Sequence, residues 1–175
     1  MRAISNIRSL LKEKNTIPVP HSVWTNPTHF ITCVFGIGCL PHMPGTWATL
    51  SSLILCTVLF PLGTTAYTTI TVLLCLCGIW LCEKTNNDFG TTDHPATCFD
   101  EFACFPICLI GLPFQWPYLL AAFLLFRFFD IIKPPPINII DQKIHGGFGV
   151  MLDDIVAALF TLIILQLSHL FFTSL

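Results

Sequence analysis

The sequence contains very little charge. Asp, Glu, Lys and Arg make up 10% of its 175 residues, whereas a soluble domain normally carries about 25%. Hydrophobic residues make up 54%, and the mean hydropathy is +0.75. A chain of this composition has too few polar side chains to cover a soluble surface, which favours a protein embedded in a lipid bilayer. Its length allows one domain but not comfortably two.

Several motifs of known chemistry are also missing. The chain has no HExxH pair of a zinc protease, no GxSxG nucleophile elbow and no P-loop. Cysteine is abundant, with nine residues, but no two form a CxxC pair and the odd number argues against full pairing. Most of the cysteines lie inside apolar runs, where they act as small apolar side chains. Neither a disulfide framework nor a cysteine metal site is expected.

Five apolar stretches indicate membrane-embedded helices, although several fall short of the roughly 20 residues of a full span. They cover residues 47–62, 66–82, 102–113, 117–132 and 154–172. The third is the weakest because it is short and contains Pro106. We therefore predict an all-α, polytopic helical membrane protein with four to five embedded helices. A sixth run, 30–40, is expected to be interfacial or re-entrant.

The N-terminal region differs from the rest of the chain. We expect a basic arm over residues 1–27 and a single membrane-embedded domain over 28–175. The first 16 residues hold four basic side chains but no apolar run follows directly, unlike a secretory signal. Two interpretations stay open, an amphipathic arm on an anionic membrane surface and a disordered tail.

Basic residues are absent from the turns at 62–65 and 113–117 and from the C-terminal tail. All eight fall on the other side of the predicted bundle: Arg2, Arg8, Lys12, Lys14, Lys84, Arg127, Lys133 and Lys143. The positive-inside rule makes that side cytoplasmic. Aromatic residues fit this topology, with Trp47 and Trp80 at the inner interface and Trp116 and Tyr118 at the outer one.

The same topology gathers the carboxylates on the cytoplasmic face. Five acids lie at the ends of apolar stretches there: Asp100, Glu101, Asp130, Asp153 and Asp154. Three more acids on this face are interpreted as solvated loop residues: Asp88, Asp93 and Asp141. Clustered acids near a membrane repel one another, so a cation is expected to compensate them.

Mg²⁺ suits such a cluster because it prefers oxygen ligands and usually combines one or two carboxylates with substrate phosphate oxygens. The predicted ligands are Asp100, Glu101, Asp153 and Asp154, and Asp130 would add a fifth carboxylate. A metal there would polarise a phosphorus–oxygen bond and lower the pKa of a water molecule. The alternative for each pair is that acids at a helix N-terminus simply complement the helix dipole.

A glycine-rich segment, 145–149, leads directly to the double Asp. Its backbone N–H groups, including those of Gly146 and Gly147, are expected to form an anion-binding nest, and His145 to protonate a leaving oxygen. Arg127 either holds a substrate phosphate or pairs with Asp130 three residues away. Lys133 either binds an anionic headgroup or anchors the chain at the interface.

These motifs resemble those of the bacterial phosphatidylglycerophosphatase A family over roughly residues 28–165. The resemblance is carried by the segments 36–38, 44–46, 100–102, 126–130, 133–134 and 145–154. It implies a Mg²⁺-dependent phosphatase of the bacterial cytoplasmic (inner) membrane, with its active site facing the cytoplasm. The expected reaction, a step of phospholipid biosynthesis, converts phosphatidylglycerophosphate, an anionic phospholipid, to phosphatidylglycerol and phosphate. Soluble relatives in the family are all-α.

The resulting hypothesis assigns catalysis to Asp100, Asp130, His145 and Asp154, and substrate binding to Thr46, Arg127, Lys133, Gly146 and Gly147. No nucleic-acid partner is expected, and no sequence pattern predicts an oligomeric state. Two alternatives are a divalent-cation transporter, since intramembrane acids often mark ion paths, and a non-catalytic membrane scaffold. The acids on one surface and the lack of an internal repeat argue against the transporter.

Overall fold

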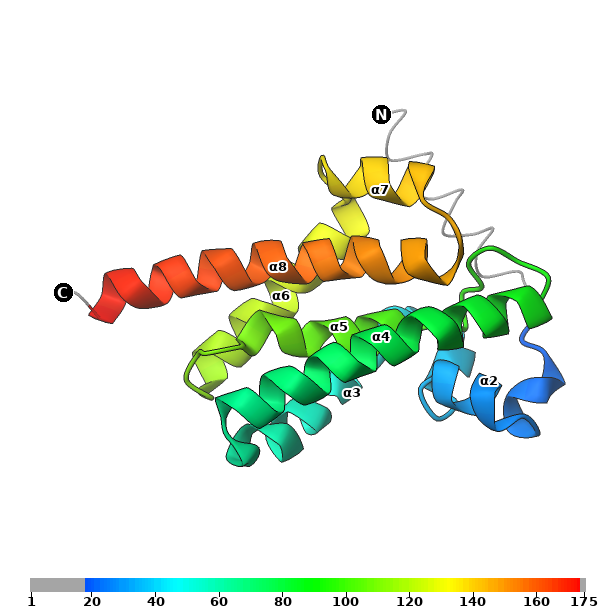
Figure 1. Ribbon diagram of the computed structural model, residues 1–175, viewed down its shortest axis with the longest axis horizontal. Coiled ribbons are helices and arrows are strands. Elements are labelled where there is room, and N and C mark those ends of the chain that lie inside the picture. The colour runs from blue at the N-terminus through cyan, green and yellow to red at the C-terminus, as the bar shows by residue number, and fades with distance from the viewer. Residues whose placement is uncertain (1–17, 174–175) are drawn as a thin grey trace.

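The computed structural model describes residues 18–173, and every regular element in that range is a helix (Figure 1). The α-helices are α2 (Pro27–Thr32), α3 (Pro44–Leu59), α4 (Thr64–Asp88), α5 (Phe99–Cys104), α6 (Trp116–Ile132), α7 (Ile137–Lys143) and α8 (Gly146–Thr173). Short 3₁₀ helices are η1 (His21–Trp24), η2 (Ile37–Cys39), η3 (Phe60–Leu62) and η4 (Phe105–Leu109). The all-α prediction is confirmed. The basic residues of the predicted arm precede residue 18 and lie outside the described range.

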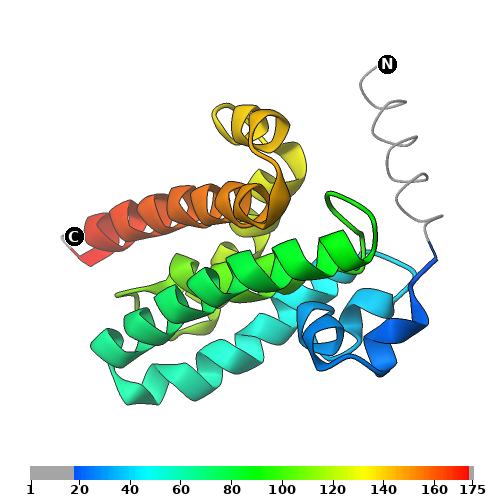
Figure 2. The same ribbon diagram turned by 45° about the vertical axis from the view of Figure 1, so that its right-hand side comes forward.

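The long helices form an antiparallel bundle. Figures 1 and 2 show α4 and α8 running along the long axis, and α5 packs against both of them. The chain reverses between α3 and α4 through η3 and Gly63, whose φ of 84° suits glycine. Successive segments therefore alternate in direction, and their ends gather into two groups at opposite ends of the bundle.

Three helices are long and apolar enough to cross a membrane, judged by length and composition: Pro44–Leu62, Thr64–Asp88 and Gly146–Thr173. Their outward faces are apolar and exposed, as at Ile54, Leu76 and Leu167. In water such faces would be unfavourable, but against lipid they carry no cost. Helix α6 is equally apolar but shorter, with 17 residues. It ends at Ile132, as the three following prolines predict.

The apolar stretch 102–113 is not one long helix. It forms the end of α5 and then η4, and all five residues of η4 are buried. Pro106 lies in the first turn of η4, where its missing N–H breaks the α-helical ladder. This segment is apolar because it fills the centre of the bundle, where α3, α6 and α8 contact it.

A side chain of α4 also holds η4 in place. The buried hydroxyl of Tyr67 donates to the Pro106 carbonyl at 2.9 Å. Polar groups buried in an apolar core are costly unless paired. Tyr67 therefore fixes the position of η4 against α4.

We expect Tyr67→Phe to destabilise the protein by about 1–2 kcal/mol, because the Pro106 carbonyl loses its buried donor. The measurement is thermal unfolding in detergent. Tyr118→Phe is the matched control, because the Tyr118 hydroxyl bonds His169 at 2.7 Å in a half-buried position where water can replace it. Equal losses of stability in the two variants would contradict the role given to Tyr67.

Candidate functional site

A cavity of about 700 Å³ opens at the end of the bundle where α3, α5 and α8 begin and α6 ends. Seven carboxylates line it: Asp93, Asp100, Glu101, Asp130, Asp141, Asp153 and Asp154. Its fixed cations are Arg127 and Lys133, and two histidines, His42 and His145, also line it. With both histidines neutral, the lining carries a formal excess of five negative charges. The prediction that the acids meet at one end of the bundle is confirmed.

Three of these acids form a compact group. Asp100 and Glu101 lie in the first turn of α5, Asp154 lies on α8, and one oxygen from each lies within 4.8 Å of the other two. Asp100 and Asp154 are buried. Burial, reinforced by the neighbouring Glu101 and Asp154 carboxylates, raises the pKa of Asp100 well above its ordinary value. Bringing these carboxylates together is therefore costly without a cation.

The group has the ligands for that cation. Within residues 18–173, Asp100 Oδ1, Glu101 Oε2 and Asp154 Oδ2 are buried and have no hydrogen-bond partner. Three convergent carboxylate oxygens that accept no hydrogen bond are typical of a site for a hard divalent ion such as Mg²⁺. The residues present thus fit a divalent metal. Without such an ion, the three carboxylates would repel one another.

Asp153 lies outside this group, contrary to its predicted place among the ligands. Its carboxylate accepts from Lys133, which also bonds Asp141 at 2.6 Å. Burial alone would lower the pKa of Lys133, but the Asp153 and Asp141 carboxylates outweigh it and raise that pKa above its ordinary value. Lys133 is thus held as a cation. Asp153 and Asp154 diverge because neighbouring side chains on a helix point about 100° apart.

The prediction that Asp153 and Asp154 open a helix is wrong. Helix α8 begins at Gly146, so both acids lie about two turns inside it. The favourable effect of a helix dipole on acids falls off within the first turn. The dipole explanation therefore fails for this pair, although it still applies to Asp100 and Glu101 at the start of α5.

Arg127 connects α6 to the acidic group. Its Nη1 lies 2.6 Å from Asp130 Oδ2 and 3.7 Å from Glu101 Oε1. The predicted pairing with Asp130 is therefore present, yet Arg127 Nε is buried and has no acceptor among the described residues. Arg127 thus lines the cavity with one N–H group that has no acceptor in the described part of the chain.

The start of α3 approaches this group closely. Gly45 has no room for a side chain, because a Cβ there would overlap the Glu101 carboxylate and press on Arg127. The neighbouring Thr46 does not line the cavity, but its Oγ1 is buried without a partner in the described range. Pro44 begins the helix, where its fixed φ is favourable.

The glycine-rich turn differs in part from the predicted anion nest. Gly146 and His145 line the cavity, whereas Gly147 is buried and lies outside the lining. The Gly147 N–H donates to the Glu83 carboxylate of α4, and a Cβ at Gly147 would overlap the Ile79 carbonyl. An internal anion therefore occupies this helix N-terminus, and Gly147 allows α4 and α8 to pack closely.

Sequence analysis missed two contributors to this end of the bundle. Glu83 caps α8 across space, and Asn87 Nδ2 in turn donates to Glu83 Oε1 at 3.2 Å. The available signal was an acid directly after the apolar stretch 66–82, next to Lys84. Asp93, interpreted as a solvated loop acid, is an exposed loop residue and also lines the cavity.

Comparisons with known proteins agree with the resemblance. The model of the family Phosphatidylglycerophosphatase A matches residues 30–169. A Phosphatidylglycerophosphatase A of Haemophilus influenzae is 43% identical over 79% of this chain and 86% of its own length. A Phosphatidylglycerophosphatase A of Escherichia coli is 37% identical over 76% of this chain and 78% of its own length. A Putative phosphatidylinositol-3-phosphatase of Bacteroides thetaiotaomicron is 36% identical over 77% of this chain and 89% of its own length. No solved structure gives a significant match.

The geometry predicts which acids hold a divalent ion. We expect Asp100→Asn and Asp154→Asn each to weaken Mn²⁺ or Mg²⁺ binding by more than about tenfold, the loss typical of removing even an outer-shell group. Isothermal titration calorimetry of the protein in detergent measures this. Asp88→Asn is the control, because Asp88 lies outside the cavity lining and pairs with Lys84. Unchanged affinity in the Asp154 variant would refute the site.

Proposed function

Because the chain belongs to the phosphatidylglycerophosphatase A family, we propose that it hydrolyses phosphatidylglycerophosphate to phosphatidylglycerol and inorganic phosphate, with Mg²⁺, in phospholipid biosynthesis. The observation that carries this proposal is the compact group of Asp100, Glu101 and Asp154, which leaves three buried oxygens unpaired. A phosphate monoester would be repelled by the acidic lining unless a divalent cation joined the two.

The metal belongs at these three carboxylates. A magnesium ion held there would offset their charge, withdraw electron density from the phosphorus and lower the pKa of a nearby water molecule. Asp130 and Asp153 are paired more closely with cations, Asp130 with Arg127 at 2.6 Å and Asp153 with Lys133, whereas Arg127 lies 3.7 Å from Glu101. We therefore assign Asp130 and Asp153 to positioning those two cations.

The phosphate group is bound and oriented by Arg127. Its Nη1 is held by Asp130, and its buried Nε has no acceptor among the described residues. A guanidinium fixed in this way meets a phosphate without first having to be ordered, which favours charge-assisted hydrogen bonding. The small volume of Gly45 keeps Glu101 and Arg127 in place beside it.

Hydrolysis forms one bond to phosphorus and breaks another. Water attacks the terminal phosphorus, a carboxylate of the acidic group accepts the proton of that water, and the phosphorus–oxygen bond to glycerol breaks. His145, at the rim of the cavity, donates a proton to the departing glycerol oxygen. The products are the free glycerol hydroxyl of phosphatidylglycerol and inorganic phosphate.

The apolar helices support a location in the membrane. Three of them have the length and composition of membrane spans, and the cavity lies at one end of the bundle. We propose the cytoplasmic membrane, with the cavity facing the cytoplasm, because the basic residues that line or flank the cavity obey the positive-inside rule. A phosphate on a lipid headgroup lies at this level of a bilayer.

The distribution of polar groups favours an enzyme over an ion transporter. A transport path requires ion-binding groups near the middle of the bundle. Buried hydroxyls there bond to backbone carbonyls instead, as Ser52 does to Phe102 at 2.7 Å and Thr161 to Ala157 at 2.9 Å. Unpaired buried carboxylates destabilise a protein, and a purely structural role as a scaffold does not explain their presence.

The first test is phosphate release by the purified protein in detergent. We expect turnover of phosphatidylglycerophosphate with Mg²⁺, its loss with EDTA and its recovery on adding excess Mg²⁺. Phosphatidylinositol 3-phosphate is the comparison substrate, because one relative is named a Putative phosphatidylinositol-3-phosphatase. A preference for the inositol lipid would correct the substrate. If folded protein released no phosphate from either lipid, the phosphatase proposal would be refuted.

A second test separates Arg127 from general charge effects. We expect Arg127→Lys to lower kcat/KM by about 10²–10³-fold, because lysine cannot reach Asp130 and the phosphate together. Lys143→Met is the control, since it removes an exposed cation of α7 that does not line the cavity. Comparable losses in the two variants would show that only overall charge matters, against the proposed contact.

A further inference from the structure

An exposed aromatic cluster lies in the segment that leads to the cavity-lining His42 and Met43, outside the groups used above. Trp24 of η1, Phe30 of α2 and Phe35 form it, with ring centroids 6.1 Å apart for Trp24 and Phe30 and 5.8 Å apart for Phe30 and Phe35. Trp24 and Phe35 are 60% and 61% exposed. Nothing in the described part of the chain covers their outer faces. We name these three residues the aromatic wedge.

The backbone under the wedge is strained in a way that exposes Phe35. Val34, Phe35 and Gly36 are consecutive left-handed residues, with φ of 47°, 57° and 93°. A β-branched residue such as Val34 rarely adopts positive φ, because that conformation is strained for it. The Trp24 ring lies against Gly36 where a Cβ would otherwise stand. Strain that presents two large apolar rings to solvent indicates a binding surface.

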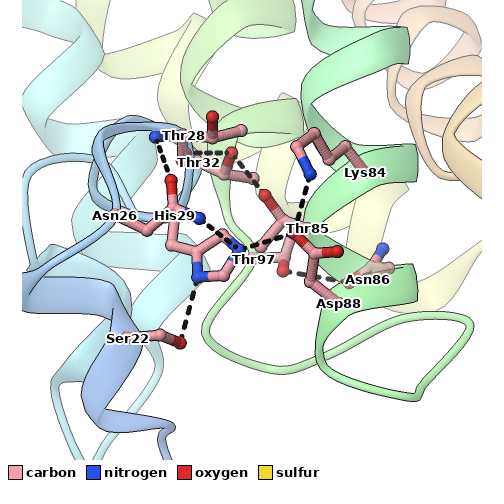
Figure 3. A network of polar contacts seen from close by, with 10 residues as sticks. All are labelled: Ser22, Asn26, Thr28, His29, Thr32, Lys84, Thr85, Asn86, Asp88 and Thr97. Atoms are coloured by element: carbon pink, nitrogen blue, oxygen red, sulfur yellow. Dashed lines mark hydrogen bonds and ion pairs between the residues drawn. The ribbon is translucent and has the colours of Figure 1, made fainter.

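The segment formed by η1 and α2, which carries Trp24 and Phe30, is held to α4 by polar contacts on its inner face (Figure 3). His29 of α2 lies 2.9 Å from Asp88 and 3.0 Å from Ser22, and Lys84 also bonds Asp88 at 3.0 Å. Thr85 of α4 donates to Thr32 of α2 at 2.9 Å. These bonds tie the unit to the polar end of α4. The wedge therefore keeps a fixed height relative to the bundle.

The apolar surface continues from the wedge onto a candidate membrane span. Exposed Leu40 and Met43 follow Phe35 along the chain, and Val34 packs against Ala48 in the second turn of α3. On α3 the exposed apolar residues have helical spacing and form one stripe: Trp47, Leu50, Ile54 and Val58. Residues 15–82, which include the wedge and this stripe, contain no Asp, Glu, Lys or Arg.

We propose that the aromatic wedge inserts into the interfacial layer of the lipid bilayer, beside the mouth of the catalytic cavity. Tryptophan and phenylalanine rings favour this layer, and an uncharged surface continuous with a membrane span suits lipid better than a protein partner. The segment between the wedge and α3 contributes His42 and Met43 to the cavity lining. Insertion therefore holds that wall of the cavity at the depth of the lipid headgroups.

Fluorescence quenching tests the insertion without reference to catalysis. A variant that keeps only Trp24 (Trp47→Phe, Trp80→Phe and Trp116→Phe) is reconstituted in phosphatidylcholine–phosphatidylglycerol vesicles containing lipids brominated at carbons 6 and 7. Those carbons lie near the interface. We expect bromolipid to quench Trp24 strongly and aqueous iodide to quench it little. Circular dichroism confirms that the variant is folded.

The matched control keeps only Trp80, which is also 60% exposed but lies on the candidate span α4. Both tryptophans should be quenched by bromolipid to a similar extent. Quenching of Trp24 by iodide, as for free N-acetyltryptophanamide, would place it in water and overturn the proposal. Protection from both quenchers would mean that protein covers the wedge, as a second copy of this chain would, and would also overturn it.

A kinetic measurement, which rests on the proposed function, tests the role of the wedge. Trp24→Ser with Phe35→Ser should raise the apparent KM for phosphatidylglycerophosphate in vesicles by at least about tenfold, since losing a single lipid-buried aromatic side chain would already have that effect. Activity on a water-soluble short-chain substrate should be unchanged. Trp116→Ser, at the opposite end of the bundle, should change neither. Equal losses on both substrates would contradict a membrane role, whereas an inactive wild type would contradict the proposed function instead.

Discussion

The structure depends on an electrostatic constraint at one end of an apolar bundle. Asp100, Glu101 and Asp154 bring unpaired oxygens together in a buried place, within a cavity that holds seven carboxylates and two fixed cations. Carboxylates buried this way repel one another and lose their hydration. In the function proposed above, a divalent cation and an anionic phosphate together would relieve both costs, so the binding of either would favour the binding of the other.

The helices are arranged to sustain that constraint. Arg127 and Lys133 each neutralise an acid next to the group, Asp130 and Asp153 respectively, and Arg127 also lies 3.7 Å from Glu101. Small residues let the elements approach, as Gly147 does for α4 and α8. Glu83 occupies the N-terminus of α8, so the anion-attracting end of that helix is already satisfied within the fold. In the proposed function, the substrate phosphate therefore binds at the acidic group and not at this helix N-terminus.

Much of this arrangement could be predicted from the sequence, and the failures have physical causes. The apolar stretches correctly predicted the long helices, and the order of acids and basic residues correctly predicted that the carboxylates share one end. The 102–113 stretch, the weakest of the five predicted, forms the end of α5 and the buried η4, because burial in a protein core and burial in lipid select the same residues. Helix α8 was predicted to begin too late, because its first turn is rich in glycine and is capped by Glu83 from another helix.

The sequence by itself determined that the protein is helical and apolar and that its acids gather at one end, because charged side chains cannot be placed along an apolar bundle. Only the tertiary structure decided which acids meet. Asp153 and Asp154 are neighbours in sequence, yet one pairs with Lys133 and the other joins Asp100 and Glu101. Adjacent residues on a helix point in different directions, and the partner of each is set by how α5, α6 and α8 pack.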